Sequence, residues 1–245
     1  MSQRSSRQQL KQRHSRRRRQ QTILIVVIVA AAVILAGLLI FISIPRNTES
    51  AGTGDVNYEE LTQVADRSGA LGFAIGDPDA PVTLVIYSDF SCPHCYDLSF
   101  VIHRIIGDLA ASGQVRVVYK PIAFVNPPYS GPAATAVICA GQQGKFWQMH
   151  DQIWELYGRY RSAGGYTRPA LFGLAEDLGL NMDAFGTCFD APETATDVQA
   201  IIDEALGMGV YGTPTLFVNG QQVYLTTIDT AYDTIKAAIE AAAGS

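Results

Sequence analysis

Residues 82–109 read VTLVIYSDFSCPHCYDLSFVIHRIIGDL, and this stretch decides the fold. Its first six residues are apolar or β-branched and predict a buried β-strand over 82–87. Ser-Asp-Phe-Ser at 88–91 predicts a turn. Apolar residues at helical spacing then predict a helix over 97–109. A pair of cysteines, two residues apart, lies where that helix begins.

The pair is Cys92 and Cys95, separated by Pro93 and His94. Cysteines at this spacing can close a small disulfide at a helix start, where the helix dipole and free backbone N–H groups stabilise the first thiolate. A stabilised thiolate exchanges disulfides readily with other thiols. Half of a zinc site is the alternative, but no second C-x-x-C or H-x-H follows at ligand spacing. The pair therefore predicts redox chemistry that needs no metal and no organic cofactor.

The first 45 residues have the pattern of a membrane anchor. Residues 1–21 form a basic tail with eight Lys/Arg, and residues 22–45 are apolar and contain no charged residue. About 20 apolar residues are needed to cross the bilayer as a helix, whereas a cleaved signal peptide has an apolar region of about 7–15. We predict an uncleaved, single-pass signal anchor with a cytoplasmic N-terminus, by the positive-inside rule. Cleavage near the alanines at 30–32 is the alternative.

Charge is distributed unevenly about this apolar segment. The net charge is −5, but the part after the segment has ten Lys/Arg against 23 Asp/Glu. Nucleic-acid binding is disfavoured there, because it requires a basic face. We interpret the basic tail as a topology determinant. All four cysteines follow the segment, where an extracytoplasmic location would allow disulfides to persist.

Beyond the anchor we expect a linker and N-terminal extension over 46–75 and one domain over 76–243. A helical block over about 131–190 is predicted to interrupt the sheet of that domain. Asn219-Gly220 between two strand-like runs is a strong hairpin signal. The strand over 115–121 is expected near a sheet edge, since it contains Arg116 and Lys120. The other expected elements are a short helix over 58–65, strands over 71–76, 215–218 and 221–225, and helices over 193–206 and 228–242.

This order predicts an α/β fold with a central mixed sheet flanked by helices. It resembles the thioredoxin superfamily, and the inserted helices resemble its DsbA branch. Three motifs in the expected order carry the resemblance, which covers roughly residues 76–242. They are Cys92-Pro93-His94-Cys95, Gly144-Lys145-Phe146-Trp147 and Gly212-Thr213-Pro214-Thr215.

The resemblance and the chemistry of the residues together suggest their roles. Cys92 should be the exposed nucleophile and Cys95 the buried resolving thiol. Pro93 is tolerated in a first helical turn, and a cationic His94 would stabilise the Cys92 thiolate. The family has a cis proline at the position of Pro214.

A cis Thr213–Pro214 bond would present the Thr213 backbone beside Cys92, where an extended substrate chain could pair with it. The resemblance further implies, as partners, exported thiol-containing proteins and a membrane reoxidant of the DsbB or vitamin-K-epoxide-reductase type.

Two positions depart from the family pattern. Thioredoxin-like proteins commonly have a buried acid six residues before the first cysteine, but this position is Ile86. Asp89 is the nearby carboxylate, and we interpret it as a turn residue, so proton transfer from Cys95 would depend on water or on Lys120. The second departure is Thr213, because oxidases often have an apolar residue before the cis proline and isomerases have threonine.

Cys139 and Cys188 lie at the two ends of the helical block, so we expect a structural disulfide between them; a second redox relay is the alternative. Phe146, Trp147 and Trp154 recur at helical spacing and are expected in the core. His150 beside Asp151 is interpreted as a capping or surface pair.

The sequence thus predicts a membrane-anchored, extracytoplasmic thiol:disulfide oxidoreductase that forms disulfides in exported proteins. An isomerase or tethered reductase using the same cysteines is the first alternative. A peptide-binding chaperone in which the thiols are incidental is the second.

Overall fold

The computed structural model describes residues 56–244. The predicted basic tail and membrane anchor, and the first part of the linker, lie outside the described residues. Within 56–244, no helix combines the length and the apolar character needed to cross a membrane.

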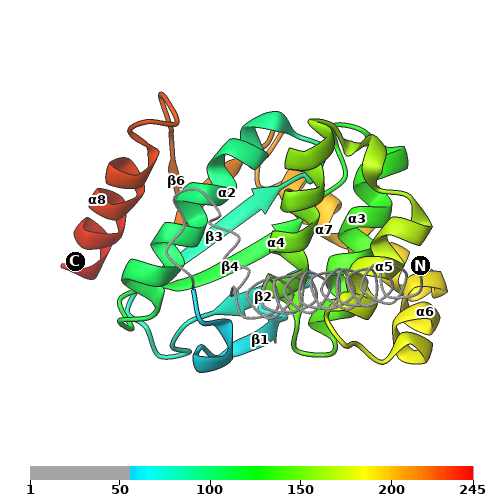
Figure 1. Cartoon of the computed structure of the whole chain (residues 1–245). Helices are drawn as coiled ribbons and strands as arrows, with labels where there is room; N and C mark the ends of the chain where they lie inside the picture. The colour runs from blue at the N-terminus through cyan, green and yellow to red at the C-terminus, as the bar shows by residue number, and fades with distance from the viewer. Residues whose placement is uncertain (1–55, 245) are drawn as a thin grey trace, which may run out of the picture. The chain divides into compact units, whose positions relative to one another are not determined.

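A mixed sheet in the order β1-β2-β4-β3-β5-β6 forms the centre of the fold (Figure 1). β3 and β4 run parallel and lie in the middle, while the other neighbouring strands pair antiparallel. A parallel pair needs a crossover, which the helix after the cysteine pair provides. The strands are β1 (Gln63–Asp66), β2 (Gly72–Ile75), β3 (Thr83–Ser88), β4 (Arg116–Pro121), β5 (Thr215–Val218) and β6 (Gln221–Val223).

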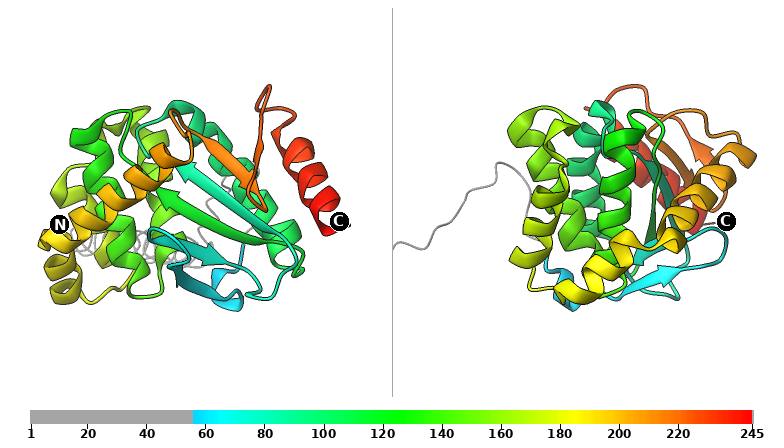
Figure 2. Two further views of the ribbon diagram at one scale, coloured as in Figure 1. Left: turned by 180° about the vertical axis from the view of Figure 1, so that it is seen from behind. Right: turned by 90° about the vertical axis from the view of Figure 1, so that its right-hand side faces the viewer.

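Helices cover both faces of this sheet, as predicted. α2 and α7 lie on opposite faces, and α8 packs against α2 (Figures 1 and 2). The helical block α3–α6 spans residues 127–190, where 131–190 was predicted, and lies between β4 and β5 in the chain. The helices are α2 (Pro93–Ile105), α3 (Pro127–Gly141), α4 (Phe146–Tyr160), α5 (Arg168–Asp177), α6 (Met182–Asp190), α7 (Pro192–Gly207) and α8 (Ala231–Ala243), with short turns η1 (Tyr58–Glu60), η2 (Ile106–Ala110) and η3 (Ala163–Gly165).

Two expectations for the sheet are wrong. The predicted helix over 58–65 is a single 3₁₀ turn followed by β1, which pairs with β2 from Gln63 opposite Ile75. The strand expected near an edge is β4, which lies between β2 and β3. Its two cations are compatible with the interior because each has a carboxylate partner: Arg116 binds Asp66 at 2.8 Å, and Lys120 binds Glu204.

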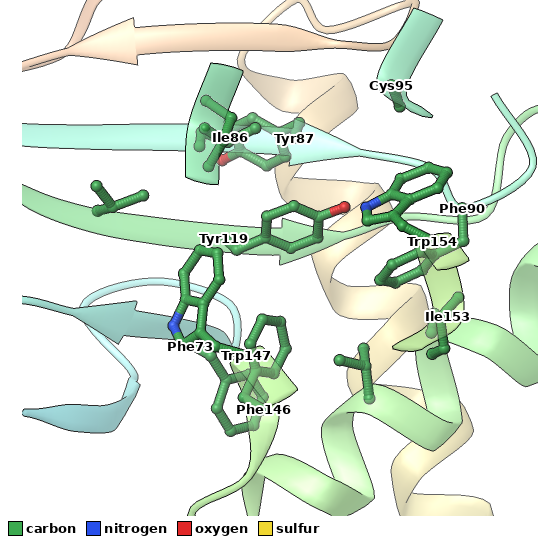
Figure 3. Packing of buried hydrophobic residues seen from close by; sticks show 14 of the residues in the cluster. Phe73, Ile86, Tyr87, Phe90, Cys95, Tyr119, Phe146, Trp147, Ile153 and Trp154 are labelled. Atoms are coloured by element: carbon green, nitrogen blue, oxygen red, sulfur yellow. The ribbon is translucent and has the colours of Figure 1, made fainter. Parts of the chain in front are cut away.

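Aromatic side chains from α4 fill the space between the helical block and the sheet (Figure 3). Phe146, Trp147 and Trp154 are buried, which confirms their expected place in the core. The surface interpretation of His150 is wrong, since this residue is 2% exposed. Its Nε2 accepts a hydrogen bond from Trp154 Nε1 at 3.0 Å, and its Nδ1 lies 2.9 Å from Asp151 Oδ1.

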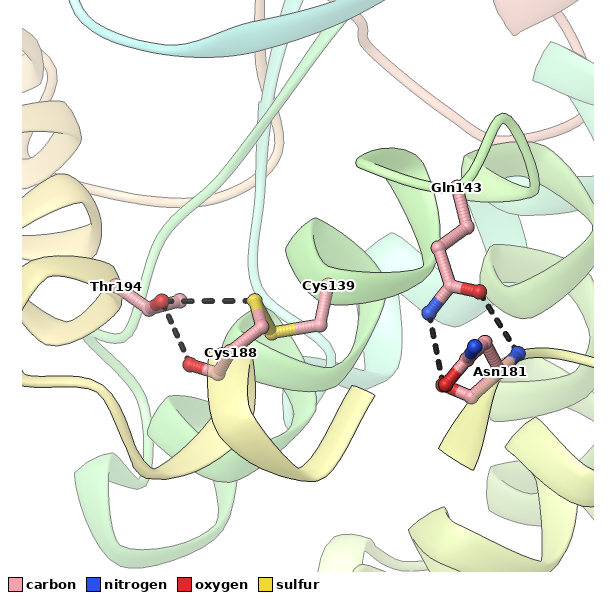
Figure 4. Close-up of a disulfide and its surroundings, with 5 residues drawn as sticks. All are labelled: Cys139, Gln143, Asn181, Cys188 and Thr194. Carbon is pink, nitrogen blue, oxygen red and sulfur yellow. Dashed lines mark hydrogen bonds between the residues drawn. A yellow bond between two sulfur atoms is a disulfide. The ribbon is translucent and has the colours of Figure 1, made fainter. Parts of the chain in front are cut away.

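A disulfide joins Cys139 in α3 to Cys188 in α6, as the sequence predicted (Figure 4). It closes a sequence separation of 49 residues. Nearby, Gln143 and Asn181 exchange two hydrogen bonds of 3.2 and 2.8 Å, so covalent and polar links together fasten α6 to the end of α3.

The predicted hairpin connects β5 and β6. Asn219 and Gly220 both have positive φ angles, 45° and 79°, as a tight turn between antiparallel strands requires. β5 pairs with β3 on one side and with β6 on the other, so the end of the loop that precedes β5 is fixed in the sheet.

Candidate active site

The cysteine pair lies at the end of β3, where the chain turns into α2. Cys92 is the N-cap residue of α2 with extended backbone angles, and Pro93 occupies the first helical position. Proline is suited to that position, because the first N–H groups of a helix have no intrahelical partner. The Cys92 N–H donates to the Asp89 carbonyl at 2.9 Å, which fixes the turn. The sulfur of Cys92 is thus placed at the positive end of the helix dipole.

Both cysteines are unbonded thiols in this structure, and both are buried. Cys95 is 2% exposed, as expected of a resolving thiol. Cys92 is 4% exposed, so the expectation of an exposed nucleophile is wrong. The reason is the loop before β5, whose Thr213 carbonyl oxygen accepts a hydrogen bond from Cys92 Sγ at 3.3 Å.

The environment of Cys92 favours its thiolate. A hydrogen bond from Cys95 is the largest influence and lowers the pKa of Cys92 to about 5. Burial opposes this shift, while the Thr213 side chain and the backbone N–H groups of Cys95 and His94 reinforce it. These surroundings therefore favour the ionised form of the first thiol. An ionised thiol is both a nucleophile and a good leaving group.

Cys95 has the opposite character. Burial and its hydrogen bond to Cys92 raise the pKa of Cys95 well above its ordinary value. Two thiols with widely separated pKa values can play different roles: in the reduced pair Cys92 can attack as a thiolate, while Cys95 keeps its proton until it resolves a mixed disulfide.

The loop before β5 is the second part of the site. Its Thr213–Pro214 peptide bond is cis, as the resemblance implied. The Thr213 hydroxyl is buried and has no hydrogen-bond partner of standard geometry. A groove of about 570 Å³ runs from His94 past Thr213 and Pro214 to residues 224–228. An extended chain in this groove would lie beside the cysteine pair.

Pro93 and His94 face outward at the start of α2. His94 lines the groove with its side chain and turns its backbone N–H toward the Cys92 sulfur. The role predicted for its side chain, stabilising the thiolate as a cation, stays a prediction.

Asp89 lies in the turn before Cys92, as predicted, and also binds groups far along the chain. Its side chain is 0% exposed. It accepts hydrogen bonds from the Ser91 N–H (2.7 Å), the Phe124 and Val125 N–H groups (2.7 Å each) and the Ser130 hydroxyl (2.6 Å). Asp89 therefore fastens the turn before Cys92 to the start of the helical block.

The side chain of Lys120 forms an ion pair with Glu204. In the parallel pair of β3 and β4, Lys120 lies opposite Tyr87. Because side chains alternate along a strand, both point to the face of the sheet opposite to the one that Ile86 and Ser88 share. Its ammonium group binds Glu204 of α7 and donates to the Ala70 carbonyl at 3.0 Å. Tyr87 also donates to Glu204, at 2.5 Å. This arrangement makes Lys120 part of an ion pair with Glu204.

Two residues that the sequence analysis did not consider lie at the buried thiol. Ser88, the last residue of β3, lies close enough to Cys95 to oppose the rise in its pKa, and a charge on Cys95 raises the pKa of Tyr119 of β4. For Ser88, the signal available in the sequence was its position at the end of a buried strand, just before the C-x-x-C motif. Among residues 56–244, no group of three or more His, Cys, Asp or Glu is placed to hold a metal ion.

Comparisons with known proteins agree with this geometry. A family model described as thioredoxin matches residues 70–241. The chain is 36% identical over 149 residues to the Na⁺/H⁺ antiporter NhaA 1 of Salinispora arenicola, a match covering 60% of this chain and 21% of that protein. The chain thus spans about a fifth of the length of the first curated relatives it matches.

A second curated relative matches along most of its length. Disulfide bond formation protein D of Bacillus subtilis is 27% identical over 175 residues, covering 68% of this chain and 74% of the relative. Among solved structures, oxidised BdbD from Bacillus subtilis aligns with a TM-score of 0.61 at 23% identity, over 76% of this chain and 98% of that chain. This structural likeness shows the fold.

Proposed function

The chain belongs to the thioredoxin family, whose model matches residues 70–241, and from this premise we propose that it is a thiol:disulfide oxidoreductase that forms disulfides in exported proteins. The redox pair is Cys92–Cys95. The observation that carries the proposal is the position of Cys92 at the N-cap of α2 beside the cis Thr213–Pro214 loop, where hydrogen bonding lowers the pKa of Cys92 to about 5 and so favours the reduced form. A pair stabilised in its reduced form passes its disulfide on to other proteins.

The reaction proceeds by two exchanges. A substrate thiolate attacks Cys92 Sγ of the oxidised pair, the Cys92–Cys95 bond breaks, and its electron pair stays on Cys95. A second substrate thiolate then attacks the substrate sulfur of the mixed disulfide, and Cys92 leaves as a thiolate. The substrate has lost two electrons and gained a disulfide, and the pair is reduced.

The groove beside Thr213 and Pro214 is the proposed substrate site. An extended segment of a partly folded protein would pair with the backbone of Thr213, which brings its cysteine to Cys92. Backbone pairing accepts many sequences, and this suits an enzyme with varied substrates.

The remaining parts of the proposal concern location and partners. The catalytic domain would lie outside the cytoplasm, held by the anchor predicted over 22–45. A membrane reoxidant of the DsbB or vitamin-K-epoxide-reductase type would restore the disulfide. Disulfide bond formation protein D, named for disulfide formation, supports the oxidising direction by similarity.

Trapping of substrates tests the proposal. In a Cys95→Ser variant the Cys92 thiolate can still attack a substrate disulfide, displacing one substrate thiolate, but no Cys95 thiol is present to release the substrate from Cys92, so mixed disulfides at Cys92 should accumulate during active secretion and disappear on treatment with reductant. Cys92→Ser combined with Cys95→Ser is the matched control and should trap nothing. If Cys95→Ser forms no adducts, or if the double variant supports secretion as well as the wild type, the chain is a peptide-binding chaperone with incidental thiols.

A further inference from the structure

The turn that carries Cys92 is tied to one buried acidic residue. Asp89 is 0% exposed, and its backbone carbonyl accepts a hydrogen bond from the Cys92 N–H at 2.9 Å. Its side-chain Oδ1 accepts a second hydrogen bond, from the Ser91 N–H at 2.7 Å. An aspartate that binds the N–H two residues ahead closes a tight turn of its own. The main chain and the side chain of Asp89 thus hold the residues immediately before the reactive sulfur.

The same carboxylate also binds two segments that follow β4. Its Oδ2 accepts hydrogen bonds from the N–H groups of Phe124 and Val125, at 2.7 Å each. Its Oδ1 accepts a further hydrogen bond at 2.6 Å from the hydroxyl of Ser130, a residue of α3 that is 0% exposed. These segments lie near the turn because β3 and β4 run parallel, so the chain leaves both strands at the same edge of the sheet.

Hydrogen bonds alone balance the charge of this carboxylate. All four partners are donors, so both oxygens of Asp89 accept, as the oxygens of an ionised carboxylate do. Among residues 56–244, no Lys, Arg or His forms an ion pair with Asp89. A tight turn requires only the bond from Ser91, whereas the other three bonds join the turn to the helical block. Losing any of them leaves a buried charge less well satisfied, which is costly.

The place of Cys92 decides how its sulfur takes part in the exchange. As the N-cap residue of α2, Cys92 lies where the positive end of the helix stabilises a thiolate. Its Sγ is 3.3 Å from the carbonyl oxygen of Thr213, at the groove proposed for the substrate. Moving a reacting atom by about 1 Å can slow a reaction on the order of a hundredfold. A residue that fixes the turn therefore affects the chemistry without touching the sulfur.

We propose that Asp89 is a positioning residue for disulfide exchange, and that its carboxylate, bound to Ser130 and to the loop at 124–125, holds Cys92 where its sulfur reacts. The proposal rests on the proposed function, because it concerns the same exchange. Asp89 takes no part in the bond changes: the substrate–Cys92 bond forms, the Cys92–Cys95 bond breaks, and the electron pair stays on Cys95. Through Ser130, the place of Cys92 comes to depend on the helical block.

The first test measures Cys92 alone, by thiolate absorbance as a function of pH in a Cys95→Ser background. Ser130→Ala removes one donor and leaves the charge of Asp89 in place, while Asp89→Glu keeps the charge but lengthens the side chain by one methylene. Asp89→Glu should raise the pKa of Cys92 by about 0.5–1 unit, the size of a helix-dipole effect, and Ser130→Ala should raise it by less. If Asp89 acted by its charge alone, both variants would titrate like the parent.

The second test measures how fast a reduced peptide opens the oxidised pair. The exchange should be on the order of a hundredfold slower in Asp89→Glu and on the order of tenfold slower in Ser130→Ala. Glu204→Gln is the control for stability, because it weakens the ion pair with Lys120 and leaves every hydrogen bond of Asp89 in place. This control should unfold more easily but exchange at the wild-type rate. Thermal unfolding checks that each variant folds.

The turn keeps one further support in all of these variants. The Tyr166 hydroxyl donates to the Phe90 carbonyl at 3.0 Å, independently of Asp89. The proposal is overturned if Asp89→Glu and Ser130→Ala both titrate and react as the wild type does, or if Glu204→Gln slows the exchange as much as they do. Should Asp89→Glu fail to fold, Ser130→Ala decides alone, and unchanged values in it overturn the proposal.

These outcomes are separable from a failure of the proposed function. If the wild-type protein does not oxidise peptides, the function fails, while the titration of Cys92 still tests Asp89. If the wild type oxidises peptides and both variants do so equally well, the function stands and Asp89 has no positioning role.

Discussion

Removing the hydrogen bond between the two cysteines should raise the pKa of Cys92. That bond is the largest influence on the Cys92 thiolate, whose pKa is about 5 in place of an ordinary 9.0. A hydrogen bond to a charged group contributes about 1.5–3 kcal/mol. Since one pKa unit corresponds to about 1.4 kcal/mol, Cys95→Ala should move the Cys92 midpoint to about 6–7.

The matched control is Cys95→Ser, which keeps a hydroxyl donor at nearly the same place. Thiolate absorbance at 240 nm, followed as a function of pH, reports Cys92 alone in both variants. We expect the serine variant to titrate near the wild-type value and the alanine variant to titrate distinctly higher. If both variants titrate near 5, the backbone N–H groups and the helix dipole carry the shift, and the reasoning about Cys95 is refuted.

Three further predictions concern stability. Cys139→Ser removes the Cys139–Cys188 disulfide and should lower the melting temperature, because the chain-entropy model gives a bond across this loop up to about 4 kcal/mol of stabilisation. The turnover of peptide oxidation should stay near normal. Lost turnover in a folded variant would favour a redox relay. Glu204→Gln should cost about 3 kcal/mol in urea unfolding, because Lys120 is left buried without its anion, and a cost below about 1 kcal/mol would show that water compensates. Acid should destabilise the fold. Burial would raise the pKa values of Asp66, Asp151 and Glu204, but hydrogen bonds and nearby cations hold all three below their ordinary range. The stability that these carboxylates add to the folded state is therefore present above about pH 4 and is lost as pH falls. Equal free energies of unfolding at pH 3 and pH 6 would contradict this prediction.

Much of the architecture could be predicted because it depends on local patterns. The strand, the cysteine pair and the helix over residues 82–109 are contiguous, so their periodicity and the position of Pro93 suffice. Asn219-Gly220 specifies a hairpin for the same reason. The cis bond before Pro214 was predictable through the resemblance, since a family pattern supplies what periodicity does not.

Three of the misses involve partners that are distant in the chain. β4 looked like an edge strand because Lys120 is charged, and its carboxylate comes from Glu204, 84 residues later. Asp89 looked like a turn residue because its donors at 124–130 lie beyond the next strand. The burial of Cys92 depends on Thr213, 121 residues away. A sequence pattern describes each segment, whereas these contacts follow from how segments pack.

The reduction potential of Cys92–Cys95, measured by equilibration with glutathione, tests the central claim most directly. A Cys92 pKa of about 5 stabilises the reduced form at pH 7 by about 3 kcal/mol relative to an unshifted thiol. For a two-electron couple this makes the pair about 60 mV more oxidising. Added to the value of about −270 mV typical of thioredoxin, this shift gives about −210 mV, so the account predicts a pair clearly more oxidising than thioredoxin, on the side of DsbA at about −120 mV. A value near about −270 mV would contradict it and make the protein a reductase.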